Sequence, residues 1–298
     1  MSMKFTVLGT ACSMPTKERS LTSLAAQFAG ETMLFDCSEG VQKRLMEAGI
    51  GLVKVSNIFI THWHGDHFFG LFGLLQTMSL LGKKTDLTVW APKSSLSKHV
   101  QEVIGVKGLA YKAEFKVLKP GKVFERNGFT VEAVKLDHSV EDYGFIIAHY
   151  KGRKFNKQKA LELGVPEGPL FSKLQRGESV KVGKKTIKAS QVLEGPERVT
   201  KAAYFFDTAV MPKMASKLKD CDLLFHECTF LEKDKDKAQD TKHSYASALA
   251  KFCKKAKVKR LVAMHLSARY KDAGEVQAEL VKHFPNSTVA RELESFEI

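Results

Sequence analysis

The sequence predicts an α/β fold, because short segments with the apolar or alternating pattern of strands recur between segments with helical spacing. Several of the strand-like segments end abruptly at a histidine or an aspartate, which would place polar side chains along one edge of a sheet. The chain has 298 residues, 44% of them hydrophobic, and can bury a large core as one domain with an insertion.

The first part of the chain is predicted to alternate strands with helices. Ser38 and Gly49 bound one helix, since serine favours a helix start and glycine a helix end. The expected strands are 4–9, 23–28, 31–37 and 55–61, and the second expected helix is 71–80.

Later strands lead into further polar residues. The pair Asn127 and Gly128 separates the β-rich segments 122–125 and 129–136 and predicts a hairpin with a type I′ turn, and His138 lies just beyond it. The same pattern recurs at 203–206, followed by Asp207, and at 260–264, followed by His265.

Residues 152–197 interrupt this alternation of strands and helices. They contain many glycines and lysines and predict an inserted arm outside the core. Residues 151–201 hold 13 Lys and Arg against 5 Asp and Glu, a balance of +8 within the chain's +14. Such an excess favours an acidic partner, since neutralised phosphates release counterions. A lysine-rich surface that serves solubility also explains it.

Cysteine content and hydropathy exclude two classes of protein. The five cysteines are an odd number with no CxxC pair, which predicts reduced, packed thiols. The apolar stretch 68–75 is far shorter than the roughly 20 residues of a membrane-spanning helix, and the N-terminus lacks the features of a secretory signal. We expect a cytoplasmic protein that does not bind membranes.

The run from His62 to His67 carries four potential metal ligands in six positions. Residues two apart in an extended segment face the same way, so His62 and His64 can bind one ion, while the following turn redirects Asp66 and His67. A lone histidine is more often a packed or solvated imidazole, but four potential ligands this close together favour a metal site.

A pair of hydrolytic ions needs roughly six or seven donors, because each ion keeps an open position for water. The sequence supplies seven. We assign His62, His64 and His138 to the first ion and Asp66, His67 and His265 to the second. Asp207 is assigned as the bridge between the two ions. We expect two Zn²⁺ per subunit, although such donors also accept Mn²⁺ or Fe²⁺.

With its HxHxDH run at 62–67, the chain resembles the metallo-β-lactamase superfamily. The resemblance implies an αββα sandwich of two mixed sheets flanked by helices, with a dinuclear site at one edge. More specific motifs are the loop Pro15–Arg19, DCSEGVQ at 36–42, THWHGDHFFGLFGLL at 61–75, HECT at 226–229 and HLSARY at 265–270. In these motifs, from Phe5 to about Tyr270, the chain is similar to short-form tRNase Z (ribonuclease Z), a zinc-dependent endoribonuclease that removes the 3′ trailer from precursor tRNA.

Residues 164–180 resemble the Gly-Pro-containing tip of the flexible arm with which short-form members grip the tRNA elbow. The resemblance thus implies a hydrolase domain over residues 1–298, a tRNA-binding arm at 152–197, and a homodimer in which the arm serves the other subunit. A solvated lysine-rich loop is the alternative. The candidate phosphate contacts are Lys151, Arg153, Lys154, Lys173 and Arg176.

Four residues depart from the family pattern without removing a metal ligand. Phe206 stands where the family commonly has Gly, and Tyr245 where it usually has Thr, so both could narrow the pocket near the scissile phosphate. The other departures are Ser38 for Gly and Ser20 for Asn.

The catalytic roles are assigned from side-chain chemistry and from the resemblance. Asp66 can accept a proton from the attacking water and is the candidate general base. His243 is the candidate acid that protonates the leaving ribose 3′ oxygen. The resemblance implies that Glu227 orients His243, although Glu227 could instead form a helix cap or a surface pair.

Two further residues are expected to support the site. Arg269 could hold a phosphate or terminal nucleotide with two of its guanidinium nitrogens, or be an ordinary surface arginine. Asp36 is expected to hydrogen-bond a ligating imidazole, with helix capping as the alternative.

Two other classes of function share part of this pattern. A lactamase, thioester hydrolase or cyclic phosphodiesterase of the same superfamily would share the metal run and would not need the arm. An RNA-binding module with structural metals would not need His243.

Overall fold

The computed structural model describes residues 2–105, 109–195, 197 and 199–298. The chain forms two compact units, and the larger one contains all seven predicted metal ligands. It consists of Met1–Glu125, Val131–Ile147 and Lys201–Ile298, while the smaller unit consists of Arg126–Thr130 and Ala148–Thr200.

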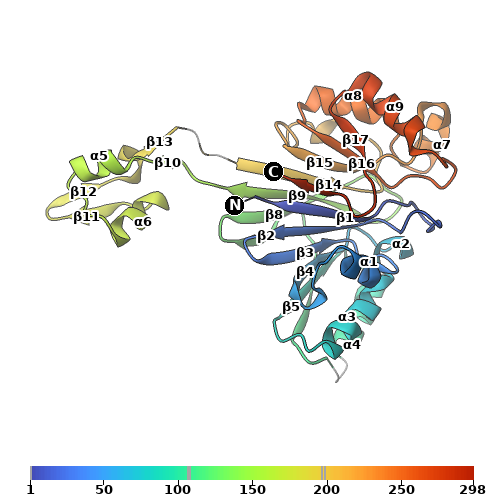
Figure 1. Ribbon diagram of the computed structural model, residues 1–298, viewed down its shortest axis with the longest axis horizontal. Helices are drawn as coiled ribbons and strands as arrows, with labels where there is room; N and C mark the ends of the chain where they lie inside the picture. The colour runs from blue at the N-terminus through green and yellow to red at the C-terminus, as the bar shows by residue number, and fades with distance from the viewer. Residues whose placement is uncertain (1, 106–108, 196, 198) are drawn as a thin grey trace. The chain divides into compact units, whose positions relative to one another are not determined.

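The larger unit is built on two mixed sheets (Figure 1). In the first sheet the N-terminal strands pair antiparallel, and the strands from β3 to β6 run parallel. Its strands, in spatial order, are β18 (Ser295–Glu297), β1 (Lys4–Gly9), β2 (Ser23–Phe28), β3 (Glu31–Phe35), β4 (Val55–Phe59), β5 (Leu87–Ala91) and β6 (Ala113–Val117).

The second sheet has parallel strands from β14 to β17. At its other end, the predicted hairpin is present, and the positive φ angles of Asn127 (51°) and Gly128 (76°) are those that a type I′ turn requires. Its strands, in spatial order, are β17 (Ser287–Val289), β16 (Leu261–Met264), β15 (Leu223–Glu227), β14 (Val199–Phe205), β9 (Tyr143–Tyr150), β8 (Phe129–Lys135) and β7 (Gly121–Arg126).

Aromatic side chains join the inner faces of the two sheets. Phe5 of β1 packs on Phe225 of β15 with ring centroids 5.3 Å apart, and Phe35 of β3 lies 5.7 Å from the ring of Tyr204 on β14. All four side chains are fully buried. Burial of rings this large supplies much of the free energy that holds two sheets face to face.

Helices cover the outer face of each sheet, so the predicted α/β class is confirmed (Figure 1). Leu249, Phe252, Cys253 and Ala256 follow helical spacing and pack on the second sheet. The helices of the larger unit are α1 (Val41–Glu47), α2 (Gly65–Phe68), α3 (Gly70–Leu80), α4 (Ser95–Gly105), α7 (Lys235–Asp240), α8 (Ala246–Ala256) and α9 (Ala273–His283). The 3₁₀ turns are η1 (Leu52–Lys54), η3 (Pro212–Met214) and η4 (Glu232–Asp234).

The helix expected to begin at Ser38 begins at Val41 instead. The Ser38 hydroxyl lies 2.8 Å from the Ser23 hydroxyl and donates to the Leu21 carbonyl at 3.0 Å, so it fixes the preceding loop rather than capping a helix. Gly40 occupies the cap position with φ 77°, a conformation that glycine adopts without steric cost.

The smaller unit has a hydrophobic core of its own, formed by side chains such as Ala160, Leu174 and Val192. It contains the arm residues 152–197, of which 196 lies outside the described residues. Its elements are β10 (Lys154–Phe155), α5 (Lys157–Glu162), α6 (Pro169–Gln175), β11 (Val180–Val182), β12 (Lys185–Ile187), η2 (Ala189–Gln191) and β13 (Leu193–Glu194), with β10 paired to β13 and β11 to β12.

All five cysteines are buried and unbridged, as expected from their spacing. No helix within the described residues combines the length and apolarity needed to cross a bilayer.

Gly70, the first residue of α3, generates a prediction about stability. A Cβ atom there would lie 1.9 Å from the Ser38 carbonyl oxygen. We expect Gly70→Ala to lower the free energy of unfolding by about 1–3 kcal/mol, measured by urea denaturation, because overpacking forces backbone shifts. Gly51→Ala is the control, since the nearest atom is 3.7 Å away on a flexible lysine. Equal losses in both variants would contradict this packing constraint.

Candidate metal centre

Most of the predicted ligands lie in loops that follow strands, whereas Asp66 and His67 lie in the short helix α2. The run from His62 starts three residues after β4, Asp207 lies two residues after β14, and His265 directly follows β16. The backbone is strained at two of them, because Asp207 (φ 47°) and His265 (φ 59°) adopt the left-handed conformation that side chains other than glycine rarely take. Such strain is characteristic of functional sites.

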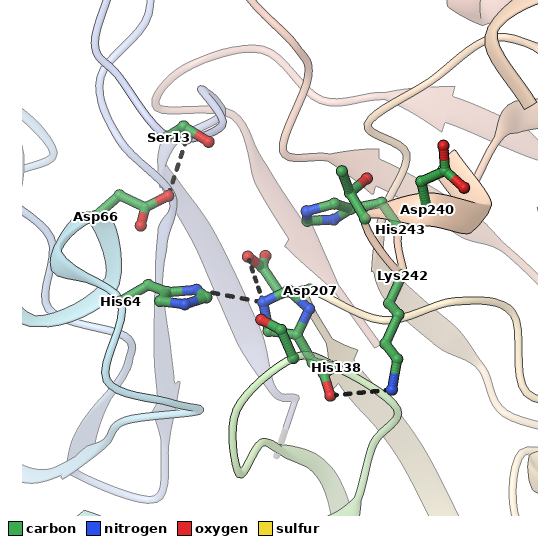
Figure 2. A pocket seen from close by; sticks show the side chains of 10 residues that line it. Ser13, His64, Asp66, His138, Asp207, Asp240, Lys242 and His243 are labelled. Atoms are coloured by element: carbon green, nitrogen blue, oxygen red, sulfur yellow. Dashed lines mark hydrogen bonds and ion pairs between the residues drawn. The ribbon is translucent and has the colours of Figure 1, made fainter. Parts of the chain in front are cut away.

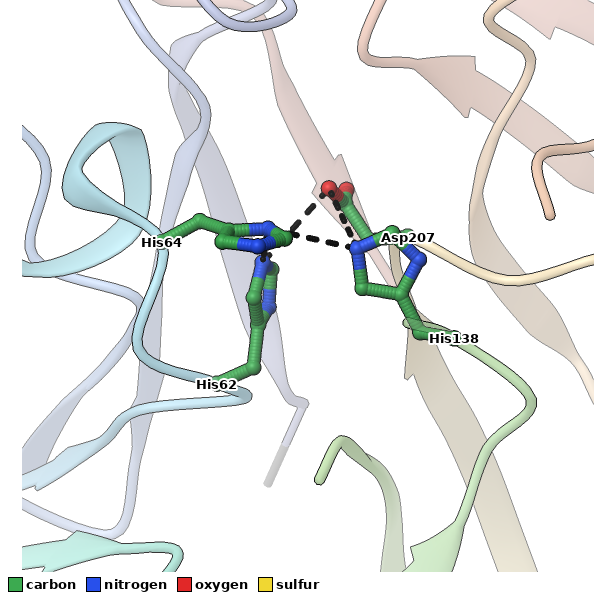
Figure 3. A group of neighbouring side chains, drawn as sticks. All are labelled: His62, His64, His138 and Asp207. Carbon is green, nitrogen blue, oxygen red and sulfur yellow. Dashed lines mark hydrogen bonds and ion pairs between the residues drawn. The ribbon is translucent and has the colours of Figure 1, made fainter. Parts of the chain in front are cut away.

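The first predicted ligand set is brought together around one point (Figure 3). His62 Nε2 lies 2.9 Å from His64 Nδ1, and His138 Nε2 lies 3.2 Å from the same atom. The ligand atoms of these three histidines and of Asp207 all lie within 4.8 Å of one another. This spacing suits a single ion with imidazole and carboxylate donors.

The second predicted set converges in the same way. Asp66 Oδ2 lies 3.5 Å from His67 Nε2 and 3.8 Å from His265 Nε2. The three residues form a second group whose ligand atoms lie within 4.8 Å of one another. The backbone N–H of Ser13 donates to Asp66 Oδ2 at 2.9 Å and holds that carboxylate in place.

The Asp207 carboxylate faces both sets. Its Oδ2 lies 3.6 Å from His62 Nε2 and 3.8 Å from His138 Nε2. Its Oδ1 lies 3.4 Å from His67 Nε2 and 3.0 Å from His265 Nε2. One oxygen per set is the arrangement that a bridging carboxylate requires.

Unsatisfied buried atoms indicate that the residues fit a bound cation. His67 Nε2, His265 Nε2 and Asp207 Oδ1 are buried and have no hydrogen-bond partner in the described structure. Buried polar atoms without partners are costly, and a divalent ion between them would satisfy all three. Nitrogen and carboxylate donors suit Zn²⁺, Mn²⁺ or Fe²⁺.

The pKa shifts of two of the histidines are consistent with a bound cation. Burial lowers the pKa of His138 to about 4, which leaves the imidazole neutral as a ligand must be. Burial also disfavours a charged His265, but the Asp207 carboxylate outweighs burial and raises its pKa well above the usual range. The Asp207 site therefore demands positive charge, which protons on the histidines or a metal ion can supply.

Side chains behind the ligands orient the imidazole rings. Asp36 Oδ2 lies 2.7 Å from His67 Nδ1, and the Tyr204 hydroxyl donates to the same oxygen at 2.9 Å. Thr229 Oγ1 lies 3.0 Å from His265 Nδ1, and Thr61 Oγ1 lies 2.9 Å from His62 Nδ1. These contacts aim each Nε2 atom at the centre and fix the tautomer.

The centre opens into a cavity of about 570 Å³ (Figure 2). His64, Asp66, His138, Asp207 and His243 contribute to its lining, so the metal centre and the candidate acid face the same space. The other lining residues are Ser13, Ser139, Asp240, Thr241 and Lys242.

Glu227 is fully buried and lies 2.8 Å, through Oε1, from His243 Nδ1. The backbone N–H of Thr208 donates to Oε1, and Thr229 donates to Oε2 through its hydroxyl at 2.6 Å. Burial lowers the pKa of His243, but the charge and hydrogen bond of Glu227 outweigh burial and raise it. His243 can therefore carry a proton toward the cavity.

The remaining candidates lie elsewhere. Arg269 contacts Asp234 at 3.2 Å and lies over the Phe230 ring, outside the described lining of the cavity. Phe206 is fully buried against Tyr204, and neither Phe206 nor Tyr245 is among the described lining residues of the cavity. Exposed arm residues in the smaller unit are Lys151, Arg153, Lys154, Lys173 and Arg176.

Several residues of the centre were not predicted from the sequence. Thr61 and Thr229 stand within the quoted motifs at 61–75 and 226–229, which was the one available signal for them. Asp142 is buried, and neither of its carboxylate oxygens has a hydrogen-bond partner in the described structure. Its Oδ1 atom lies 3.6 Å from His62 Nδ1. Burial raises the pKa of Asp142 well above its usual range.

Comparison with known proteins decides the family. The ribonuclease Z of Archaeoglobus fulgidus is 39% identical over an alignment that covers 100% of this chain and 98% of that relative. The chain belongs to the ribonuclease Z family. A model described as Anti-Pycsar protein Apyc1 also matches residues 3–157, which end before Asp207, His243 and His265.

Solved structures confirm the metallo-β-lactamase fold that the resemblance implied. Human short-form tRNase Z matches with a TM-score of 0.69 and 24% identity, covering 98% of each chain. YhfI from Bacillus subtilis, a metallo-β-lactamase fold protein, matches with a TM-score of 0.72 and 16% identity, covering 100% of each chain. At these identities the two structures show the shared fold alone.

The Asp36 contact generates a prediction about metal affinity. Asp36→Asn keeps the size of the side chain, and asparagine tolerates the φ of 59° found there. Because an amide no longer fixes the His67 ring as a carboxylate does, we expect zinc affinity to fall by about 10–100-fold in a chelator competition titration.

Asp220→Asn is the matched control, because Asp220 is exposed and has a similar φ of 57°. An Asp36→Asn protein that binds zinc as tightly as Asp220→Asn would show that the Asp36 hydrogen bond does not support the metal centre.

Proposed function

We propose that this ribonuclease Z family member is an endoribonuclease that removes the 3′ trailer from precursor tRNA, with two Zn²⁺ per subunit and a 3′ hydroxyl left on the tRNA. The full-length similarity to a ribonuclease Z supports the reaction. The observation that carries the mechanism is the Asp207 carboxylate, which offers one oxygen to each histidine set.

Two bound zinc ions would lower the pKa of a water molecule and neutralise charge on the scissile phosphate. His62, His64 and His138 would hold one ion, Asp66, His67 and His265 the other, and Asp207 both. Asp66 lines the cavity. Burial raises the pKa of its carboxyl group, but the nearby His265 and His67 imidazoles outweigh burial and lower that pKa. A carboxylate ionised at neutral pH can accept a proton from the attacking water.

His243 donates the proton that the leaving ribose 3′ oxygen needs. Glu227 fixes the ring through Nδ1, which leaves Nε2 as the atom available to the leaving group. The smaller unit supplies an exposed basic surface that suits the phosphates of a folded RNA without reading its sequence. We further propose that two copies pair, so that each arm serves the active site of the other.

His243→Gln tests the assignment of the acid. We expect kcat on precursor tRNA to fall by about 10²–10⁴-fold, with zinc content unchanged. A diester with a p-nitrophenolate leaving group should lose far less, because that group departs without a proton. His283→Gln, on α9, is the control. Equal losses on both substrates would contradict the role of His243 as an acid.

The arm is tested by replacing Lys151, Lys154 and Lys173 together with glutamine. We expect KM for precursor tRNA to rise at least about tenfold and to depend less on salt, since each lost phosphate contact removes about 0.7–0.9 from the slope of log affinity against log salt. Turnover of the small diester should not change.

The matched control carries three glutamines in the larger unit, at Lys254, Lys255 and Lys282. Equal KM values for the two triple variants would remove the arm from RNA binding. Turnover of small diesters without any cleavage of precursor tRNA would instead favour a small-substrate hydrolase.

A further inference from the structure

One cationic side chain in the cavity has no role in the mechanism above. Lys242 is the only lysine or arginine among the described lining residues, which include three carboxylates, those of Asp66, Asp207 and Asp240. A polyanionic RNA that enters this cavity meets a single ammonium group outside the metal centre. The position of that group therefore bears on how the RNA backbone lies.

The Lys242 ammonium forms an exposed ion pair with a carboxylate that a phosphate group could replace. Its Nζ lies 2.9 Å from Asp137 Oδ1. The same atom lies 3.4 Å from the His138 carbonyl oxygen (Figure 2). The two side chains are 47% and 53% exposed, so this ion pair contributes little to stability. A phosphate oxygen can replace the Asp137 carboxylate at small cost.

The backbone of Lys242 is held firmly beside the candidate acid. Its N–H donates to the Gln239 carbonyl at 3.2 Å, and the N–H of His243 donates to the Ala238 carbonyl at 2.8 Å. Lys242 has a φ of 55°, a conformation that favours glycine or asparagine. The two hydrogen bonds fix the backbone from which the Lys242 side chain reaches the lining of the cavity.

The ion pair also lies between two cavities. Lys242 lines the catalytic cavity, and Asp137 lines a second cavity of about 460 Å³. The second cavity is otherwise lined by Leu136, Val210, Met211, Pro212 and Lys213. An RNA strand that continues from the catalytic cavity into the second passes over the Lys242–Asp137 pair.

We propose that Lys242 is a phosphate-binding residue, which exchanges Asp137 for a nonbridging oxygen of a phosphate next to the scissile one. The inference rests on the proposed function, because it assumes an RNA substrate. Asp137 then competes with the RNA for the ammonium group. The two partners of one ion pair should therefore affect RNA binding in opposite directions.

Equilibrium binding of precursor tRNA tests this, with all variants made in a zinc-loaded His243→Gln background so that the RNA stays intact. We expect Lys242→Met to raise Kd by about fivefold or more and to reduce the salt slope by about 0.7–0.9, and Asp137→Asn to lower Kd by about twofold. Lys217→Met should leave Kd unchanged, because Lys217 is also 47% exposed and paired with a carboxylate, Glu132, outside the cavity.

Precursors with one neutral methylphosphonate, on either side of the scissile phosphate, identify the contact. Lys242→Met should lose its effect on one of these two RNAs, since the phosphate that it binds is already neutral there. An undiminished effect on both RNAs, a Kd equal to that of Lys217→Met, or weaker binding by Asp137→Asn would overturn the proposal. Failure of the unsubstituted enzyme to cleave precursor tRNA would overturn the proposed function separately, because these measurements concern binding.

Discussion

The Asp207 carboxylate is the group on which the rest of the centre depends. Its two oxygens face different histidine sets, so a single side chain fixes the separation of the two proposed ions. Its negative charge, buried in the protein, raises the pKa of His265 and so demands a compensating cation. Its backbone is strained, and its carboxylate oxygen Oδ1 has no hydrogen bond in the described structure. Both costs are explained if the site is built to hold metal.

The sandwich provides the rigid support for this arrangement. Strands β4, β14 and β16 belong to two different sheets and end near one another, so residues far apart in sequence meet at one edge. The N–H of Gly70 donates to the Cys37 carbonyl at 3.0 Å and so ties the loop of Asp36 to α3, and Asp36 in turn orients His67. Packing and ligand geometry are thus coupled through a few short contacts.

The sequence predicted the α/β class, and it singled out ligand candidates whose side chains the structure brings together, because the run His62–His67 is contiguous and strand ends mark Asp207 and His265. Among the supporting residues it singled out Asp36, which contacts His67, but not Thr229, since threonine is a common residue type whose role comes only from its neighbours in space. The helix start at Ser38 was wrong because a tertiary hydrogen bond uses its hydroxyl. The hydrophobic core of the smaller unit was not predicted, because its apolar residues are scattered among lysines in the sequence.

Anomalous diffraction at the zinc edge, on crystals of the zinc-loaded protein, tests the central claim most directly. The account predicts two peaks about 3.5–4 Å apart, the spacing of two-metal hydrolytic sites, with one oxygen of Asp207 bonded to each. His62, His64 and His138 should ligate one ion, and Asp66, His67 and His265 the other. A single peak, or two peaks with Asp207 bonded to one ion alone, would contradict it.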